Sequence, residues 1–497
     1  MSSNSRKAGI LLPVFALYNK YGIGCFSKEA YDFVDFLKES GQKYLQILPL
    51  GPTGYGDSPY QSFSTFAGNP YFIDITALVK DGLLTEEECE RYSAADGEYI
   101  NYEKLFKTRF ELLRLAFSRF DMAGEEDFGK FAYENAYWLE DYSLFMALKD
   151  SFGGKAWSEW DEGIRNRHPE EISRYRDKLW GEMDFYKFQQ FYFDKQWKKL
   201  KAYANKNDVE IVGDIPIYVA FDSSDAWAHP ELFDLDEKHI PNAVAGCPPD
   251  PFAITGQLWG NPLYNWKHHH DTGYDWWITR IANCFRLYDV VRIDHFRGFD
   301  EFYAIPYEDE TAEFGEWRKG PGIEIFNAIK NRLGDKKIIA EDLGFLTDSV
   351  RELVKTTGYP GMKVLMFAFD SDNRSEYLPH MIDKNSVIYT GTHDNETVRG
   401  WYKRIREKEP KTFKYFNDYT GCESEEDAAM CAIKLALSSV SDTAIIPMQD
   451  YLNLDNDARI NEPSTLGFNW NVMLKEGVFT EELSESIKKL TTIYGRD

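Results

Sequence analysis

The chain has 497 residues, and 43% of them are hydrophobic, which is ample for a large core. The formal net charge at pH 7 is −25, which disfavours nucleic acid and anionic membrane surfaces as partners, since both attract basic proteins. An uncharged substrate such as a sugar is compatible with this charge.

The first residues contain one short apolar run, Ile10 to Phe15, which is interrupted by Pro13. This pattern predicts neither a signal peptide nor a transmembrane span. The six cysteines are scattered and form no CxxC pair, which is typical of reduced thiols rather than of a disulfide or zinc framework. We therefore expect a cytoplasmic protein; a monomer and a homodimer both remain open.

Eight short β-rich runs follow one another along the chain. They are residues 8–15, 44–50, 209–219, 289–296, 337–344, 362–369, 386–394 and 442–451. Most are nearly continuous apolar runs, as expected for parallel strands covered on both faces, and amphipathic helical segments separate several of them. The order predicts an α/β fold, a (β/α)₈ TIM barrel, without a C-terminal β-sandwich after the last strand.

Two connections are much longer than a barrel requires. Residues 76–208 read mainly as amphipathic helix and predict an inserted helical subdomain. Residues 220–288 are rich in Pro, Trp and His and predict a second insertion, which carries a loop at 248–262. Barrel enzymes elaborate their loops in this way on the catalytic face. We expect residues 1–497 to form a single catalytic barrel domain that carries both insertions.

Charged side chains gather where the predicted strands end. They are Asp214, Arg292, Asp294, Glu341, Asp342, Asp370, His393, Asp394 and Asp450. One such charge is easily explained by a structural ion pair, but charges at the same end of six strands are not. The carboxyl ends of barrel strands form the catalytic face, so we expect an active site there.

Two of these carboxyl groups have opposed surroundings. Arg292 and Asp294 share one face of a strand, and a neighbouring cation favours the carboxylate form that suits a nucleophile. Glu341 lies among apolar residues, which raise a carboxyl pKa and suit a general acid. Such a pair, with Asp394 as a third carboxylate, is typical of retaining glycoside chemistry.

Histidines offer a second reading of the same region. His295 and His393 are suited to donating to sugar hydroxyls, but each is equally well explained as a satisfied strand-end histidine. The runs "KHHHD" (267–271) and "THDN" (392–395) raise a metal-dependent hydrolase as an alternative. Adjacent histidines on a loop converge poorly on one ion, and no HExxH motif is present, so we expect no metal and no cofactor.

Three motifs resemble the catalytic signatures of the 4-α-glucanotransferases, also called amylomaltases or disproportionating enzymes, which are relatives of the α-amylases. They are "VVRIDHFRGF" (290–299), "IIAEDLG" (338–344) and "TGTHDNE" (390–396). The resemblance continues through "ILPLGPTGYGDSPYQSFSTFAGNPYFIDI" (47–75), "GDIPIYV" (213–219), "TGQLWGNPLYNW" (255–266), "WRKGPG" (317–322) and "ARINEPST" (458–465). It thus spans essentially the whole chain, with the motifs in the family's order.

The resemblance implies a role for each matching residue. Asp294 matches the family's nucleophile, Glu341 its general acid/base and Asp394 its transition-state stabiliser. Arg292 and His393 match residues that hold the donor glucose. The further implied sugar contacts are a stacking Tyr60, Asp214, Ser58, Asn461 and, in the covering loop 248–262, Asp250, Gln257 and Trp259.

The chain departs from the family pattern at four positions. Pro251 and Ala253 replace the usual residues of the covering loop, and Val472 and Met473 stand where the family has Trp and Arg. These changes spare the carboxylates but bear on acceptor and chain-length preference.

The resemblance implies transfer of a segment of a 1,4-α-glucan to the 4-hydroxyl of glucose or of another glucan. The expected substrates are maltooligosaccharides, amylose, starch or glycogen. The carboxylates alone do not separate this transferase from an α-amylase-like retaining hydrolase. A catalytically inactive glucan-binding protein is disfavoured because all three carboxylates are present.

Overall fold

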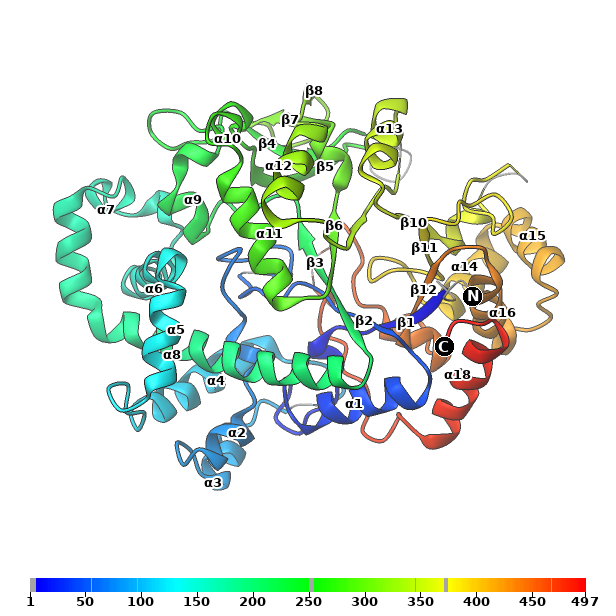
Figure 1. Ribbon diagram of the computed structural model, residues 1–497, viewed down its shortest axis with the longest axis horizontal. Helices are drawn as coiled ribbons and strands as arrows, with labels where there is room; N and C mark the ends of the chain where they lie inside the picture. Colours follow the sequence, from blue (N-terminus) through cyan, green and yellow to red (C-terminus); the bar gives the residue numbers. More distant parts are fainter. Residues whose placement is uncertain are drawn as a thin grey trace.

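The computed structural model describes residues 6–54, 56–95, 97–249, 254–344, 346–370, 374–465 and 467–497, and Figure 1 shows its arrangement. Eight parallel strands close into a barrel in the order β1-β12-β11-β10-β9-β6-β3-β2. They are β1 (Lys7–Leu11), β2 (Tyr44–Gln46), β3 (Glu210–Pro216), β6 (Val290–Asp294), β9 (Ile338–Ala340), β10 (Gly361–Val364), β11 (Ser386–Tyr389) and β12 (Thr443–Pro447). The predicted barrel is confirmed, and each of its strands overlaps one of the eight predicted runs, with β1 and β10 beginning one residue earlier.

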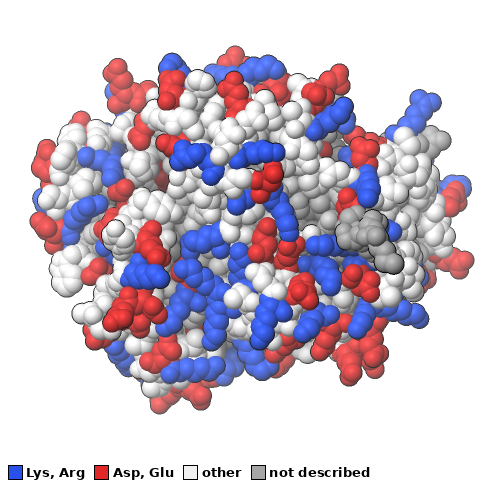
Figure 2. Space-filling model, in the orientation of Figure 1, with Lys and Arg blue, Asp and Glu red and all other residues white. Residues whose placement is uncertain are grey.

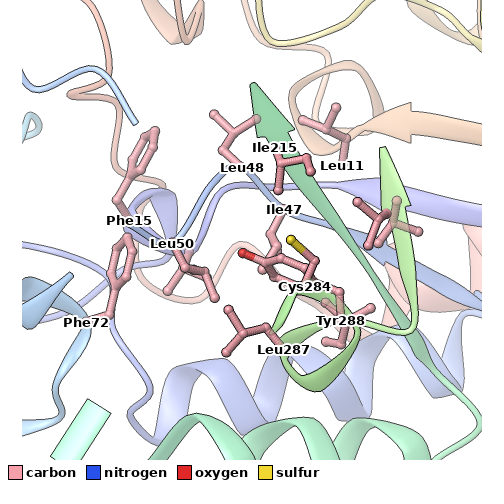
Figure 3. Close-up of a cluster of buried hydrophobic side chains, with 14 of the residues drawn as sticks. Leu11, Phe15, Ile47, Leu48, Leu50, Phe72, Ile215, Cys284, Leu287 and Tyr288 are labelled. Atoms are coloured by element: carbon pink, nitrogen blue, oxygen red, sulfur yellow. The ribbon is translucent and has the colours of Figure 1, made fainter. Parts of the chain in front are cut away.

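The strands are shorter than the apolar runs that predicted them. After β10 the chain turns into a 3₁₀ helix, η6 (Leu365–Ala368), and after β12 into the short helix α17 (Met448–Tyr451). Both segments stay buried although they leave the sheet. Their hydrophobic sequence therefore reflects burial and does not indicate a β-strand. Figure 3 shows part of the buried hydrophobic core, including Leu11 of β1, Ile47, Ile215 of β3 and Tyr288 just before β6.

The first insertion, between β2 and β3, is helical throughout its regular elements within the described residues. Its elements are η2 (Pro70–Phe72), α2 (Ile75–Lys80), α3 (Glu86–Arg91), α4 (Tyr102–Phe117), α5 (Glu126–Glu134), α6 (Ala136–Ser151), η3 (Trp157–Glu159), α7 (Glu162–Arg165) and α8 (Pro169–Lys206). Helix α8 has 38 residues and packs against α6, α5, α4 and α1 (Lys28–Glu39) and against β3. In Figure 1 these helices, from blue to green, form an arm beside the barrel.

A second sheet lies on the catalytic side of the barrel and was not predicted. Its antiparallel strands are β5 (Gln257–Pro262), β4 (Ala243–Cys247), β7 (Glu301–Pro306) and β8 (Glu316–Lys319), in that order. The central pair, β4 and β7, joins residues from before and after β6, so this sheet stands over the β6 end of the barrel.

The remaining helices surround the barrel. They are η1 (Val14–Ala16), α1 (Lys28–Glu39), α9 (Ser224–Ala228), η4 (Pro230–Leu232), α10 (Trp266–Asp271), α11 (Asp275–Leu287), η5 (Phe296–Phe299), α12 (Ile323–Leu333), α13 (Asp348–Thr357), α14 (Val398–Lys408), α15 (Pro410–Thr420), α16 (Glu425–Ser438), η7 (Asn456–Ala458) and α18 (Glu481–Ile493). Within the described ranges, no helix is long and apolar enough to cross a membrane.

Candidate active site

An arginine bridges two carboxylates at the carboxyl ends of neighbouring strands. Asp214 of β3 and Arg292 of β6 are direct register partners, and Asp294 follows on the same face of β6. The Arg292 Nη1 donates to both Asp214 oxygens, at 2.7 and 2.6 Å, and its Nη2 donates to Asp294 Oδ1 at 2.9 Å. Arg292 is 3% exposed and Asp214 is fully buried, so the pair forms the floor of the barrel mouth.

Opposing influences act on the pKa of Asp294. Burial raises this pKa, the Arg292 guanidinium lowers it, and the negative charges of Asp214 and Asp394 raise it again. The net direction is upward from the ordinary value of aspartate. Arg292, the cation that the sequence analysis pairs with Asp294, does contact it. Arg292 is also bound to Asp214, so it lowers the pKa of Asp294 less than an unshared cation would.

Glu341 follows directly after β9 and is held by two backbone amides. The N–H of His295 donates to Glu341 Oε2 and the N–H of Leu343 donates to Oε1, both at 2.7 Å. Burial and the negative charge of Asp294 raise the pKa of Glu341 to about 7, against the lowering effect of Arg292 and of the two amides. At neutral pH, Glu341 is thus divided between its acid and carboxylate forms.

His295 reaches Glu341 through its backbone because of an unusual conformation. Its φ of 53° and ψ of 48° place it in the left-handed region, which is uncommon for a residue with a side chain. Its imidazole meets the Trp259 ring edge-to-face, with centroids 4.8 Å apart. Burial and the charge of Arg297 lower the pKa of His295 to about 3, so the ring is neutral.

Tyr60 joins the Asp214–Arg292 pair to His393. The Tyr60 hydroxyl lies 2.9 Å from Asp214 Oδ2 and 2.9 Å from His393 Nε2, and its ring stacks on the His393 ring with centroids 5.2 Å apart. The Oγ of Ser58 accepts the Tyr60 N–H at 3.3 Å, so Ser58 supports the turn that presents Tyr60.

Asp394 is fixed from the segment that follows η7. The Asn461 Nδ2 donates to Asp394 Oδ1 at 2.7 Å, and His393 Nε2 lies 3.4 Å from the same oxygen. Arg459 donates to the carbonyl groups of Asp394 and of Asn461, each at 2.8 Å. The sequence analysis missed Arg459, although it lies within the quoted motif at 458–465.

The structure does not gather every predicted residue equally. Gln257 lies on β5 and accepts the Trp259 Nε1–H at 3.1 Å, so both are at the edge of the mouth. Asp370 is exposed, and the charged groups that act on it are Glu409 and Arg404 rather than the barrel carboxylates. Asp250 lies outside the described residues, as do Pro251 and Ala253.

Two of the strand-end carboxylates hold backbone instead of facing the mouth. Asp342 Oδ1 accepts the Met362 N–H at 2.7 Å. Asp450 lies on α17, where it accepts from the Thr390 hydroxyl at 2.5 Å and from the Val398 N–H at 2.8 Å.

The two C-terminal departures lie beside the helical insertion. Val472 forms an isolated antiparallel bridge with Tyr99, and Met473 packs half-buried against the core.

The histidine-rich run lies on α10, away from these carboxylates. His269 is buried, with its Nε2 3.1 Å from the carbonyl of Leu232, and burial lowers its pKa to about 4. In the described part of the chain, no group of three His, Cys, Asp or Glu side chains is placed to hold a metal ion.

A closed (β/α)₈ barrel whose mouth gathers an arginine with several carboxylates defines a class of protein, the barrel enzymes of glycoside chemistry. The chain belongs to the 4-alpha-glucanotransferase family: the model of glycoside hydrolase family 77, described as 4-alpha-glucanotransferase, matches residues 12–479. The predicted family, fold class and transferase activity are thereby confirmed.

Individual relatives agree with the family match. The chain is 50% identical to a 4-alpha-glucanotransferase of Clostridium butyricum over 487 residues, which are 97% of this chain and 99% of the relative. It is 49% identical to one of Streptococcus pneumoniae over 494 residues, 99% of this chain and 97% of the relative. The structure of an amylomaltase from Streptococcus agalactiae in complex with acarbose superimposes with a TM-score of 0.95 at 41% identity, covering 99% of both chains.

Proposed function

We propose that this 4-alpha-glucanotransferase works by a retaining double displacement on 1,4-α-glucans, with Asp294 as nucleophile and Glu341 as acid and base. One observation carries the assignment: Asp294, bound by Arg292, lies close enough to the protonatable Glu341 for its negative charge to raise the pKa of that carboxyl. The structure of the Streptococcus agalactiae amylomaltase is a complex with acarbose, which supports a ligand of this class for the present enzyme.

In the first step, Asp294 attacks C1 of the donor glucose. Glu341 gives its proton to the glycosidic oxygen as the bond from C1 to that oxygen breaks, and the shortened glucan leaves with a free 4-hydroxyl. The pKa of about 7 leaves a substantial fraction of Glu341 protonated at neutral pH, as this role requires.

In the second step, the same environment turns Glu341 into a base. Once Asp294 is esterified, its negative charge no longer raises the pKa of Glu341, while the amides of His295 and Leu343 still favour the carboxylate. Glu341 then takes the proton of an incoming 4-hydroxyl, whose oxygen displaces Asp294 from C1. The anomeric configuration is retained after two inversions.

The other gathered residues bind and polarise the donor sugar. Asp394, oriented by Asn461, is suited to hydrogen bonds with sugar hydroxyls that strengthen in the transition state. Tyr60 offers a ring face on which a sugar can stack, and it is positioned by Asp214, His393 and Ser58. Arg292, Asp214 and His393 also hold the donor glucose. We retain Asp370 and Asp250 as predicted glucan contacts.

Transfer requires that an acceptor hydroxyl replace water at the covalent intermediate. Trp259 and Gln257 on β5 cover the side of the mouth at His295, which favours a stacked sugar over free water. The alternative, an α-amylase-like hydrolase, has the same carboxylates but needs an open path for water.

We also infer that the enzyme acts in the cytoplasm, without nucleic-acid or membrane partners. None of the six cysteines, all within the described residues, is in a disulfide, as is usual for proteins of the reducing cytoplasm. Figure 2 shows acidic and basic side chains interspersed over the face that it displays, as on the surface of an enzyme for a neutral substrate.

The deciding experiment follows the products formed from pure maltotriose, separated by chromatography over time. We expect a ladder of longer maltooligosaccharides together with glucose. Glucose and maltose alone, with no longer species at any time, would show that water is the acceptor.

Asp294→Asn tests the nucleophile in the same assay. Transfer should fall by several orders of magnitude while the circular dichroism and the unfolding midpoint stay near those of the parent. Activity near that of the parent would refute the assignment.

A further inference from the structure

A cavity of about 240 Å³ lies inside the barrel at the amino ends of the strands, opposite the catalytic mouth. Branched aliphatic side chains from five different strands line it. They are Val212, Val290, Ile339, Val387 and Ile445. Its mouth lies between Tyr44, the Lys336–Lys337 pair and the turn at 358–360, which precede or begin strands.

The sequence explains why this end of the barrel is not filled. The interior of a TIM barrel is normally packed by layers of large side chains. Here Gly9 of β1, the register partner of both Tyr44 and Ile445, adds no side chain to the layer. A Cβ at Gly9 would lie 2.5 Å from the Cβ of Tyr44, so the position cannot be filled without moving β2.

The lining determines what kind of molecule fits. An apolar cavity of about 150 Å³ stays dry and takes up benzene, so the larger space here accommodates one substituted ring or a short branched aliphatic chain. A charged group among these aliphatic side chains would lose its hydration without gaining a partner there; the polar groups of the lining are Thr443 and, at the mouth, Tyr44, Tyr359, Lys336 and Lys337. At the mouth, the Lys337 ammonium is already paired with Glu210.

We propose that the amino end of the barrel is a binding site for a small neutral apolar molecule, separate from the glucan site. Val212 and Val290 lie two residues before Asp214 and Arg292 on β3 and β6, and Ile339 of β9 lies two residues before Glu341, which directly follows that strand. Because alternate residues share a face, the bound molecule rests against the layer directly beneath the catalytic one. This inference is independent of the proposed mechanism.

Fluorobenzene, observed by ¹⁹F NMR, is the probe. We expect saturable binding to the parent enzyme and at least tenfold weaker binding to Val387→Phe, whose ring occupies the cavity. Val440→Phe is the matched control, because Val440 is 51% exposed and outside the cavity, and it should bind like the parent. Should Val387→Phe not fold, Val387→Leu adds one methylene and should still weaken binding.

Competition separates this cavity from the active site. Saturating maltotriose, added to the inactive Asp294→Asn enzyme, should leave fluorobenzene bound. Displacement by maltotriose, equal binding to the parent and the folded Val387 variants, or no saturable binding would each overturn the proposal.

A second observation concerns the sulfur of Met362. The Arg292 Nε donates to Met362 Sδ at 3.2 Å, while the other guanidinium nitrogens serve Asp214 and Asp294. Met362 is itself fixed, because it is fully buried and its N–H donates to Asp342. Within this buried site the thioether is the acceptor for the Nε–H, which would otherwise be left unsatisfied.

We infer that Met362 is a positioning residue that aims Arg292 at Asp294, an inference that rests on the proposed role of Asp294. Met362→Leu keeps the side-chain volume but removes the acceptor, and it should lower kcat about tenfold with little change in KM. Met362→Gln restores an acceptor of similar reach and should recover most of that loss.

A merely structural role for Met362 would not give this pattern. The inference fails if the Met362→Leu variant is as active as the parent, or if Met362→Gln is impaired as much as Met362→Leu. Activity near that of the parent in Asp294→Asn, by contrast, would refute the proposed nucleophile, and with it the premise that Met362 aims Arg292 at a catalytic Asp294.

Discussion

At the scale of single residues, the backbone contributes as much to the site as the side chains. The left-handed conformation of His295 turns its N–H toward Glu341, and Leu343 supplies the second amide. The left-handed conformation costs free energy for a residue with a side chain. Such strained conformations persist at sites where the geometry serves a function.

The pKa of Glu341 predicts how the rate depends on pH. In the free enzyme Glu341 must carry a proton for the first step, so kcat/KM for maltotriose should fall as the pH rises through about 7. Initial rates between pH 5 and 9 measure this alkaline limb. A rate that is flat across this range would contradict Glu341 as the proton donor.

The catalytic side chains could be predicted from the sequence, but the backbone contacts that hold them could not. Asp294, Glu341 and Asp394 are visible as strand-end carboxylates, and in the structure the charge of Asp294 reaches Glu341. The amide of His295 and the sulfur of Met362 leave no such signal, because any residue has an N–H and a buried methionine usually reads as core.

At the scale of elements, the barrel strands were predictable and the second sheet was not. Most barrel strands lie in longer, nearly continuous apolar runs, whereas β4 is the short sequence "AVAGC" and its partner β7 lies beyond β6. Antiparallel pairing over such a distance leaves no local periodicity to detect. The hydrophobic runs also extended past the true strand ends into η6 and α17.

The buried Asp450 lies on α17 and links this helix to the start of α14, where it accepts the Val398 N–H. Burial raises its pKa to about 6, since no cation is among its partners. A carboxyl whose pKa is raised on folding costs stability as the pH rises from about 4 through 6. Asp450→Asn should therefore be more stable than the parent at pH 8, by about 1–3 kcal/mol, with the gain absent at pH 4.

Urea unfolding at the two pH values measures this difference. The asparagine keeps an oxygen for the Val398 N–H and offers its Nδ2 to the Thr390 hydroxyl oxygen. A variant that is less stable at both pH values would contradict the argument.

Two glycines predict opposite effects of one substitution. In β3, a Cβ on Gly213 would lie 2.1 Å from the Tyr288 ring, so Gly213→Ala should destabilise by about 1–3 kcal/mol. In α8, Gly181 has nothing within 4 Å of the corresponding position, so Gly181→Ala should stabilise by about 0.5–1 kcal/mol. Chemical denaturation distinguishes them, and a shift of the same sign in both would refute the packing explanation.

At the scale of the whole molecule, the two ends of the described chain are joined. Arg496 is fully buried and donates to the carbonyl groups of Leu437, Ser439, Ser441 and Lys7, at 2.7–3.2 Å. It thus ties α16 and the approach to β12 to the start of β1, as the adjacent ends in Figure 1 illustrate.

Arg496→Met should lower the free energy of unfolding by about 2–4 kcal/mol, because several buried carbonyl groups lose their donor together. Arg91→Met is the matched control: Arg91 lies on the surface in an i,i+4 pair with Glu87, and its loss should cost under about 0.5 kcal/mol. Urea titration of both variants provides the comparison. Equal effects would show that burial of Arg496 is unimportant.

The closure of the barrel also has a consequence for synthesis on the ribosome. Lys7 of β1 pairs with Thr443 of β12, so one edge of β1 has no partner until nearly the whole chain has been translated. At about 5–20 residues per second, this wait lasts roughly 20–90 s. During that time the open edge is free to join the strands of other nascent chains, so chaperone occupancy during translation should govern the yield of enzyme in the cell.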